Sequence, residues 1–124
     1  MRKSVAALIS GLFIVSQAPP AFATRETITG QVIDLVCYTR NKANTGTDHD
    51  QGRACAQACV KWEGNPVGLV AANGKVYQFA GDLVANNNAK IAPHLAHTVT
   101  VTGDVTEKDG TLMIAASDVK MVKQ

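Results

Sequence analysis

The chain has 124 residues, of which 46% are hydrophobic and 18% are charged, with twelve basic and ten acidic side chains. This length is enough for one small domain with a modest core. The basic residues are scattered and aromatic residues make up only 5% of the chain, so we do not expect the positive stripe or the stacking surface that binds nucleic acid.

The first 23 residues have the pattern of a secretory signal peptide. A basic start is followed by an apolar run at 5–15, and Ala21-Phe22-Ala23 provides the small residues that signal peptidase recognises. The apolar run is well short of the roughly 20 residues that span a bilayer. We therefore predict cleavage after Ala23, a periplasmic or secreted location without membrane insertion, and a single domain at 24–124 with equal numbers of basic and acidic residues.

The domain is predicted to contain five strands, because Val, Ile and Thr recur in runs that turn-forming residues separate. The expected strands lie at 27–38, 67–71, 75–79, 98–106 and 112–122. A polar loop at 39–52 and an alanine-rich helix at 53–62 separate the first two strands. Asn73-Gly74 predicts a tight hairpin between the second and third strands, and a short helix is expected at 86–91, before the fourth strand.

Alternation along the last two strands indicates which side chains share a face. In the fourth strand the predicted set is Val99, Val101, Gly103 and Val105. In the fifth strand the predicted set is Met113, Ala115, Val119 and Met121.

This order of elements predicts a mainly β fold. We expect a small five-stranded OB-fold-like barrel, with a short helical insertion between strands one and two and a short helix before strand four. Closure into a barrel removes the exposed strand edges that a two-layer sheet of this size would struggle to cover. An open β-sandwich with a similar number of strands is the alternative.

Short motifs spread over nearly the whole predicted domain form one pattern. They are Thr29-Gly30-x-Val32-x-Asp34-x-x-Cys37-Tyr38, His49, Cys55-Ala56-x-x-Cys59, Pro66-x-Gly68-Leu69, Gly74-Lys75-Val76-Tyr77, Gly81-Asp82 and Val99-Thr100-Val101-Thr102-Gly103. In these motifs the chain resembles a group of small, secreted, largely uncharacterised bacterial proteins with an OB-fold-like barrel and a Cys-Tyr…His…Cys-x3-Cys insertion. The resemblance implies the barrel fold and no particular activity.

The three cysteines and one histidine form the most distinctive cluster of the sequence. Cys37, His49, Cys55 and Cys59 lie within 23 positions, and the chain has no other cysteine. On a helix, Cys55 and Cys59 would have Cβ atoms about 5–6 Å apart, which is longer than the roughly 3.8 Å of a disulfide. A metal ion tolerates that spacing, so we predict a site of three thiolates and one imidazole for zinc or copper.

A disulfide is the alternative, because an oxidising compartment favours one and three is an odd number of thiols. A bridge from Cys37 to Cys55 or Cys59 would pin the inserted helix to the barrel and stabilise it by roughly 2–4 kcal/mol. The protein would then be a stapled interaction module without metal, with another envelope protein as its partner. The sequence contains no nucleophile–base pair and no paired catalytic carboxylates, so an enzyme is not expected.

Four further residues have expected roles in or near this insertion and the loop before the fourth strand. We expect Trp62 to anchor the helix to the barrel. Asp34 is expected at the surface, with orientation of His49 as the alternative. His94 and His97 are interpreted as polar loop residues, with a second metal site as the alternative.

Overall fold

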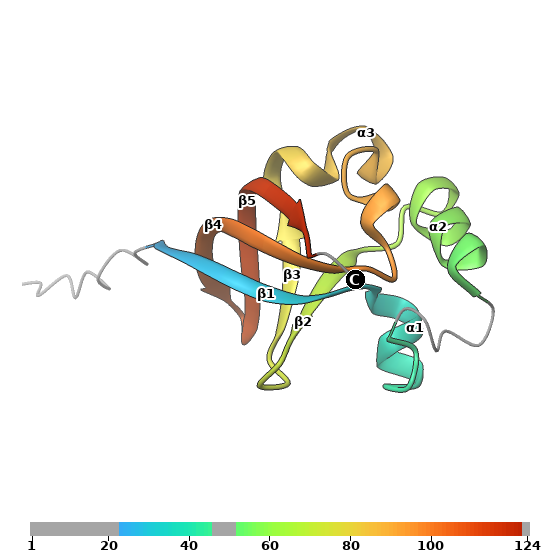
Figure 1. Ribbon diagram of the computed structural model, residues 1–124, viewed down its shortest axis with the longest axis horizontal. Coiled ribbons are helices and arrows are strands. Elements are labelled where there is room, and N and C mark those ends of the chain that lie inside the picture. The colour runs from blue at the N-terminus through green and yellow to red at the C-terminus, as the bar shows by residue number, and fades with distance from the viewer. Residues whose placement is uncertain (1–22, 46–51, 123–124) are drawn as a thin grey trace, which may run out of the picture.

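The computed structural model describes residues 23–45 and 52–122, and all structural statements below concern these residues (Figure 1). The strands are β1 (Thr24–Asp34), β2 (Val67–Ala71), β3 (Val76–Ala80), β4 (Thr98–Lys108) and β5 (Thr111–Met121). The helices are α1 (Leu35–Arg40), α2 (Gly52–Trp62) and α3 (Ala85–Asn88), with 3₁₀ turns η1 (Gly81–Val84) and η2 (Ala92–His94). None of the helices in this part of the chain is long and apolar enough to cross a membrane. The predicted signal peptide lies outside the described residues except for Ala23.

The five strands form a closed barrel in the order β1-β2-β3-β5-β4. β1 closes the ring because it pairs antiparallel with β4 through Thr24–Gln31 and with β2 through Gly30–Asp34. β3 and β5 pair in parallel, while the remaining pairs are antiparallel. The predicted five-stranded OB-fold-like barrel is therefore confirmed, and the open-sandwich alternative is wrong. Figure 1 shows α1 and α2 at the end of the barrel where β1 finishes.

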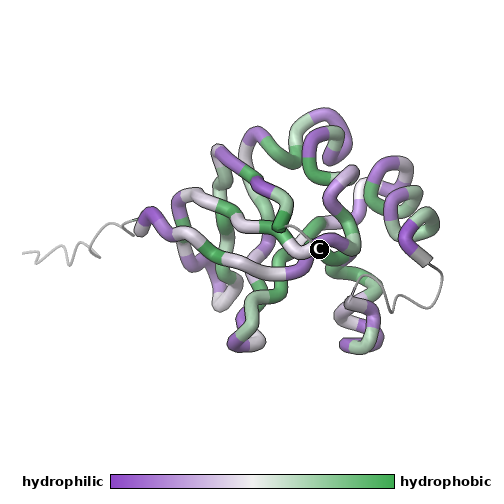
Figure 2. The backbone as a smooth tube through the Cα atoms, viewed as in Figure 1, coloured by the Kyte–Doolittle hydropathy of each residue, from purple (hydrophilic) through white to green (hydrophobic). Residues whose placement is uncertain are grey.

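The core fills the inside of this barrel and extends under the helices. The predicted face of β4 is confirmed, since Val99, Val101, Gly103 and Val105 are all buried. Figure 2 shows hydrophobic positions in green along this strand, with paler positions of intermediate hydropathy between them. The fully buried apolar side chains are Val32, Ile33, Val60, Val67, Leu69, Ile91, Leu95, Val99, Val101 and Ile114. Burial of each such side chain contributes about 1.5–3 kcal/mol, so α2 and the loop before β4 are held by the same core as the strands.

A bulge in β5 changes the predicted face of that strand. The predicted set was Met113, Ala115, Val119 and Met121. The buried residues of β5 are instead Ile114 and Ala116, because the register with β4 shifts between Thr102 and Gly103 and leaves Ser117 as an extra residue. Val119, beyond the bulge, does pack against the core. The prediction is thus wrong for Met113 and Ala115, since one extra residue exchanges the two faces of a strand.

Candidate functional site

Cys37 lies on a helix rather than at the end of the first strand. The predicted strand continued to Tyr38, but β1 ends at Asp34 and α1 follows at once. The Asp34 carboxylate causes this change, because its Oδ1 accepts hydrogen bonds from the backbone N–H groups of Val36 at 2.9 Å and Cys37 at 3.3 Å. These are the bonds of a helix N-cap, and they satisfy donors that the first turn leaves without partners.

The start of α1 also depends on a close approach to β2. Gly68 has no side chain, and a Cβ atom there would lie 2.6 Å from Leu35 Cδ2 and 3.1 Å from the carbonyl oxygen of Tyr77. The first residue of α1 therefore packs directly on the backbone of β2. The glycine of the Pro66-x-Gly68-Leu69 motif is therefore explained by the position of α1, which leaves no room for a side chain at position 68.

Asp34 is part of a polar network that connects α1 with the end of α2. Its side chain is only 1% exposed, and Oδ2 accepts a hydrogen bond of 3.0 Å from Nδ2 of Asn65. The Nδ2 group of Asn88 donates to the carbonyl oxygens of Asn65 at 3.1 Å and Val60 at 2.9 Å. The expectation of a surface carboxylate at Asp34 is therefore wrong. The carboxylate is buried, and its hydrogen bonds to the first turn of α1 and to the side-chain amide of Asn65 satisfy it there.

The structure brings Cys37 and the two cysteines of α2 into one region. The predicted helix is confirmed, and Cys55 and Cys59 lie one turn apart on it. Cys59 makes a side-chain hydrogen bond with Cys55 and lies close enough to Cys37 to affect its ionisation. All three cysteines are half-buried and carry thiols rather than disulfide sulfurs. His49 lies outside the described residues, in the segment between α1 and α2.

The surroundings of the thiols favour their protonated form. Burial raises the pKa of Cys37, and the negative charge of Asp34 and the neighbouring Cys59 raise it further. Burial likewise raises the pKa of Cys59, with Cys55 and Asp34 as further causes. Since the thiolate is the nucleophile and the metal ligand, the raised pKa values lower the fraction of these two cysteines that is in the reactive form at neutral pH.

The described residues alone do not complete a metal site. Among residues 23–45 and 52–122, no three side chains of Cys, His, Asp or Glu lie close enough together to hold one ion. Cys59 makes a side-chain hydrogen bond with Cys55 on the same helix, and its charge acts on Cys37 of α1. The predicted fourth ligand, His49, belongs to the part of the chain that is not described.

The opposite side of α2 faces the loop that contains η2. Arg53 donates from Nε to the carbonyl oxygen of Leu95 and from Nη2 to that of Pro93, at 2.8 and 2.6 Å. Trp62, at the end of the helix, is 83% exposed, and Lys61 Nζ lies 5.8 Å from its ring centroid. The prediction that Trp62 anchors the helix is wrong, because Arg53 and the buried residues of α2 do so.

A contact between His94 and Met121 was missed by the sequence analysis. Nδ1 of His94 lies 3.1 Å from Sδ of Met121. Burial lowers the pKa of His94, and the positive charges of His97 and Arg53 act in the same direction. The two residues are 27 positions apart, so no local pattern connects them. The bulge in β5 also changes which way the end of the strand faces, and this could not be predicted from the sequence.

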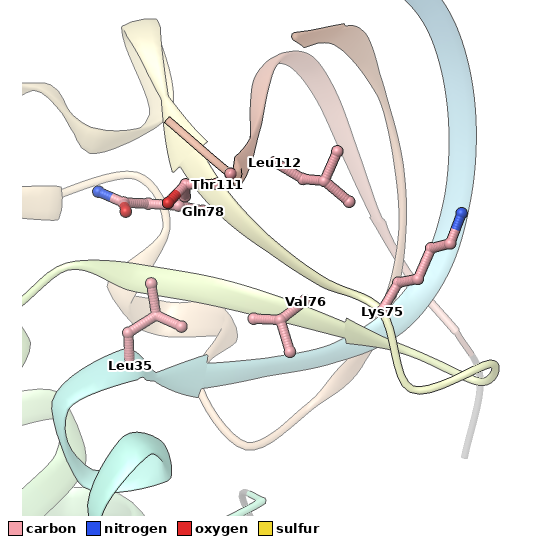
Figure 3. A pocket seen from close by; sticks show the side chains of 7 residues that line it. Leu35, Lys75, Val76, Gln78, Thr111 and Leu112 are labelled. Carbon is pink, nitrogen blue, oxygen red and sulfur yellow. The ribbon is translucent and has the colours of Figure 1, made fainter. Parts of the chain in front are cut away.

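A shallow apolar groove runs between α1 and the outer side of the barrel. One part, of about 380 Å³, is lined by Leu35, Val76 and Leu112 among others (Figure 3). A neighbouring part of about 500 Å³ extends along α1 past Thr39 and Arg40. Figure 3 shows that the side chains around the first part come from α1, from β3 and the turn before it, and from the start of β5.

No protein-family model, no curated protein and no solved structure matches this chain. The resemblance indicated by the sequence motifs is therefore established for the fold alone, a small closed five-stranded β-barrel.

Proposed function

We propose that this protein is a small periplasmic metal-binding domain that holds one zinc or copper ion between α1 and α2. Cys37, Cys55 and Cys59 supply three thiolates, and His49 supplies an imidazole. The observation that carries the proposal is the position of Cys59, which contacts Cys55 and lies near Cys37. A disulfide would use two of these sulfurs, whereas one ion uses all three.

The electrostatic environment also favours a cation. The negative charge of Asp34 that disfavours the thiolate of Cys37 attracts a positive ion at the same place. An ion that displaces the thiol protons also overcomes the raised pKa values, so metal binding releases protons and strengthens as the pH rises. Binding requires the three sulfurs to close around the ion together with the imidazole of His49.

The test is a measurement of zinc stoichiometry and affinity on the mature protein purified without oxidation. We expect one zinc ion per chain by native mass spectrometry. Cys37→Ser, Cys55→Ser and Cys59→Ser should each weaken zinc binding at least tenfold, because each removes a thiolate from the shell. His49→Ala should also weaken it, and His97→Ala is the matched control that should leave zinc affinity unchanged.

The proposal fails if the protein isolated from the periplasm contains two sulfurs in a disulfide, one thiol and no bound ion. That result would support the second candidate, a stapled interaction module. The proximity of Cys37 to Cys59 favours a bridge between these two residues, and a loop of this length corresponds to about 3 kcal/mol of stabilisation. Peptide mapping would then find the Cys37–Cys59 link, and the groove beside α1 would be the first surface to examine for an envelope protein partner.

A further inference from the structure

A nitrogen and a soft sulfur ligand atom lie together away from the cysteines. The imidazole of His94, at the end of η2, lies 3.1 Å from the thioether sulfur of Met121, at the end of β5. Arg53 of α2 contacts the loop that holds His94. Cys55 follows Arg53 by two residues, which is about 200° around a helix, so the cysteines and His94 lie on different sides of α2.

Backbone hydrogen bonds to β1 hold the loop that contains His94. The N–H of Val32 donates to the carbonyl oxygen of His97 at 3.1 Å, and the carbonyl oxygen of Val32 accepts from Ala96 at 3.0 Å. The N–H of His97 in turn donates to the carbonyl oxygen of His94 at 3.0 Å. Two backbone hydrogen bonds therefore join the loop to β1, and a third joins His97 to His94 within the loop.

Met121 is fixed by the last pairs of the β4–β5 ladder. It pairs with Val99, whose side chain is fully buried. The next residue, Val122, donates its N–H to the carbonyl oxygen of Thr98 at 3.0 Å. The contact lies at the surface, since Met121 is 48% exposed. An ion can therefore approach this contact from the surface, without any opening of the barrel.

The spacing of the two ligand atoms suits a single ion. An ion at about 2.0 Å from nitrogen and about 2.3 Å from sulfur touches both atoms of His94 and Met121 with an angle of roughly 90° between the two bonds. A small outward movement of the Met121 side chain gives the wider angles of trigonal or tetrahedral coordination. His97, whose charge affects that of His94, is the candidate for a third ligand.

The chemistry of the pair selects the ion. A thioether is a soft, neutral ligand that suits copper(I), whereas zinc takes thiolate, imidazole and carboxylate ligands. Neither His94 nor Met121 brings a negative charge, and the positive charge of Arg53 acts on this position. A divalent ion would be repelled about twice as strongly as a monovalent one, which again favours copper(I).

We propose that His94 and Met121 form a binding site for a soft monovalent cation, copper(I). This site shares no residue with the thiol site, so it goes beyond the proposed function and does not depend on it. Copper(I) can therefore bind at the surface of the barrel without using the cysteine thiols.

The test uses the full mature chain with Cys37, Cys55 and Cys59 replaced by Ser. Copper(I), buffered by a chelator, is titrated into this protein in the absence of oxygen. We expect one bound ion per chain, and we expect Met121→Leu and His94→Ala to weaken binding at least tenfold. Met113→Leu is the matched control, because Met113 lies on the same strand away from the imidazoles. Equal affinity of the Met121→Leu and Met113→Leu variants would overturn the proposal.

A second measurement covers the case in which the cysteine-free chain does not fold. The wild-type protein is labelled at the methionine methyl groups and observed by NMR. Its thiols are first saturated with copper(I). Addition of one further equivalent of copper(I) should shift the Met121 methyl resonance and leave that of Met113 in place. An unchanged Met121 resonance would show that the His94–Met121 contact is only a hydrogen bond to sulfur.

Discussion

Asp34 determines where the first strand stops and how the nearest thiol ionises. One carboxylate oxygen caps α1, the other accepts from Asn65, and the negative charge raises the pKa of Cys37. In the sequence this residue was indistinguishable from a surface carboxylate on a strand. The cap uses partners two and three residues away, but the bond to Asn65, 31 residues away, could not be predicted from the local pattern.

Asp34→Asn separates the capping of α1 from the effect of the negative charge on the pKa of Cys37. An asparagine caps a helix about as well as an aspartate, so α1 should persist, while loss of the charge should lower the pKa of Cys37 toward its ordinary value. We expect iodoacetamide to alkylate Cys37 several-fold faster at pH 8 in the reduced, metal-free variant, as measured by mass spectrometry. Asp104→Asn, at an exposed carboxylate, is the control. An unchanged rate at Cys37 in Asp34→Asn would contradict this account.

Among the elements, α1 shows best how tertiary contacts override local preference. Its sequence, Leu-Val-Cys-Tyr-Thr-Arg, continues the β-forming composition of β1 and predicts a strand. A helix of six residues is too short to be stable by itself. It forms because Asp34 caps it and because Gly68 leaves room for Leu35 on the surface of β2.

Gly68→Ala should therefore act on α1 more than on β2. The added methyl group would meet Leu35, and we expect the free energy of unfolding to fall by about 1–3 kcal/mol, measured by denaturant titration. Leu35→Ala in the same chain creates space, so the double variant should lose less stability than the sum of the two single changes. Strict additivity would show that Gly68 is needed for another reason, such as the closeness of an added Cβ atom to the carbonyl oxygen of Tyr77.

Other elements were predicted well, and the differences have local physical causes. The helix at 53–62 and the strand at 67–71 agree with α2 and β2 to within one residue, because composition and turn residues mark both ends. The face of β5 was wrong in its first half, since a bulge is produced by pairing with β4 and leaves no mark in hydrophobic alternation. The helix at 86–91 was only approximate, because three consecutive asparagines adopt positive φ angles there.

For the molecule as a whole, the barrel followed from the order of the elements. A chain of this length with five short strands closes into a ring to remove its edges, and no knowledge of individual contacts was needed. The candidate site did not follow in the same way. The proximity of Cys37 and Cys59 depends on where α1 and α2 lie at the end of the barrel, while the contact of His94 with Met121 depends on the register of the last strand.

The raised pKa values predict how global stability changes in alkali. The folded state holds the protons of Cys37 and Cys59 more tightly than the unfolded chain. Their contribution is therefore present below the ordinary thiol pKa of about 8.5, and is lost as the pH rises through the folded values. The free energy of unfolding of the reduced, metal-free protein should fall more steeply above this pH than that of a Cys37→Ser/Cys59→Ser variant. Parallel curves from denaturant titrations at pH 8 and pH 10 would contradict the prediction.

The ring closure through β1 has a consequence for how copies of this chain associate. The β2–β3 and β4–β5 hairpins are local in sequence, whereas Thr24 of β1 pairs with Val105, far along the chain. Detachment of β1 would leave both hairpins intact and uncover one edge of β2 and one edge of β4. The first strand of a second copy fits those two edges, so strand exchange is the route to dimers that this topology offers at high concentration.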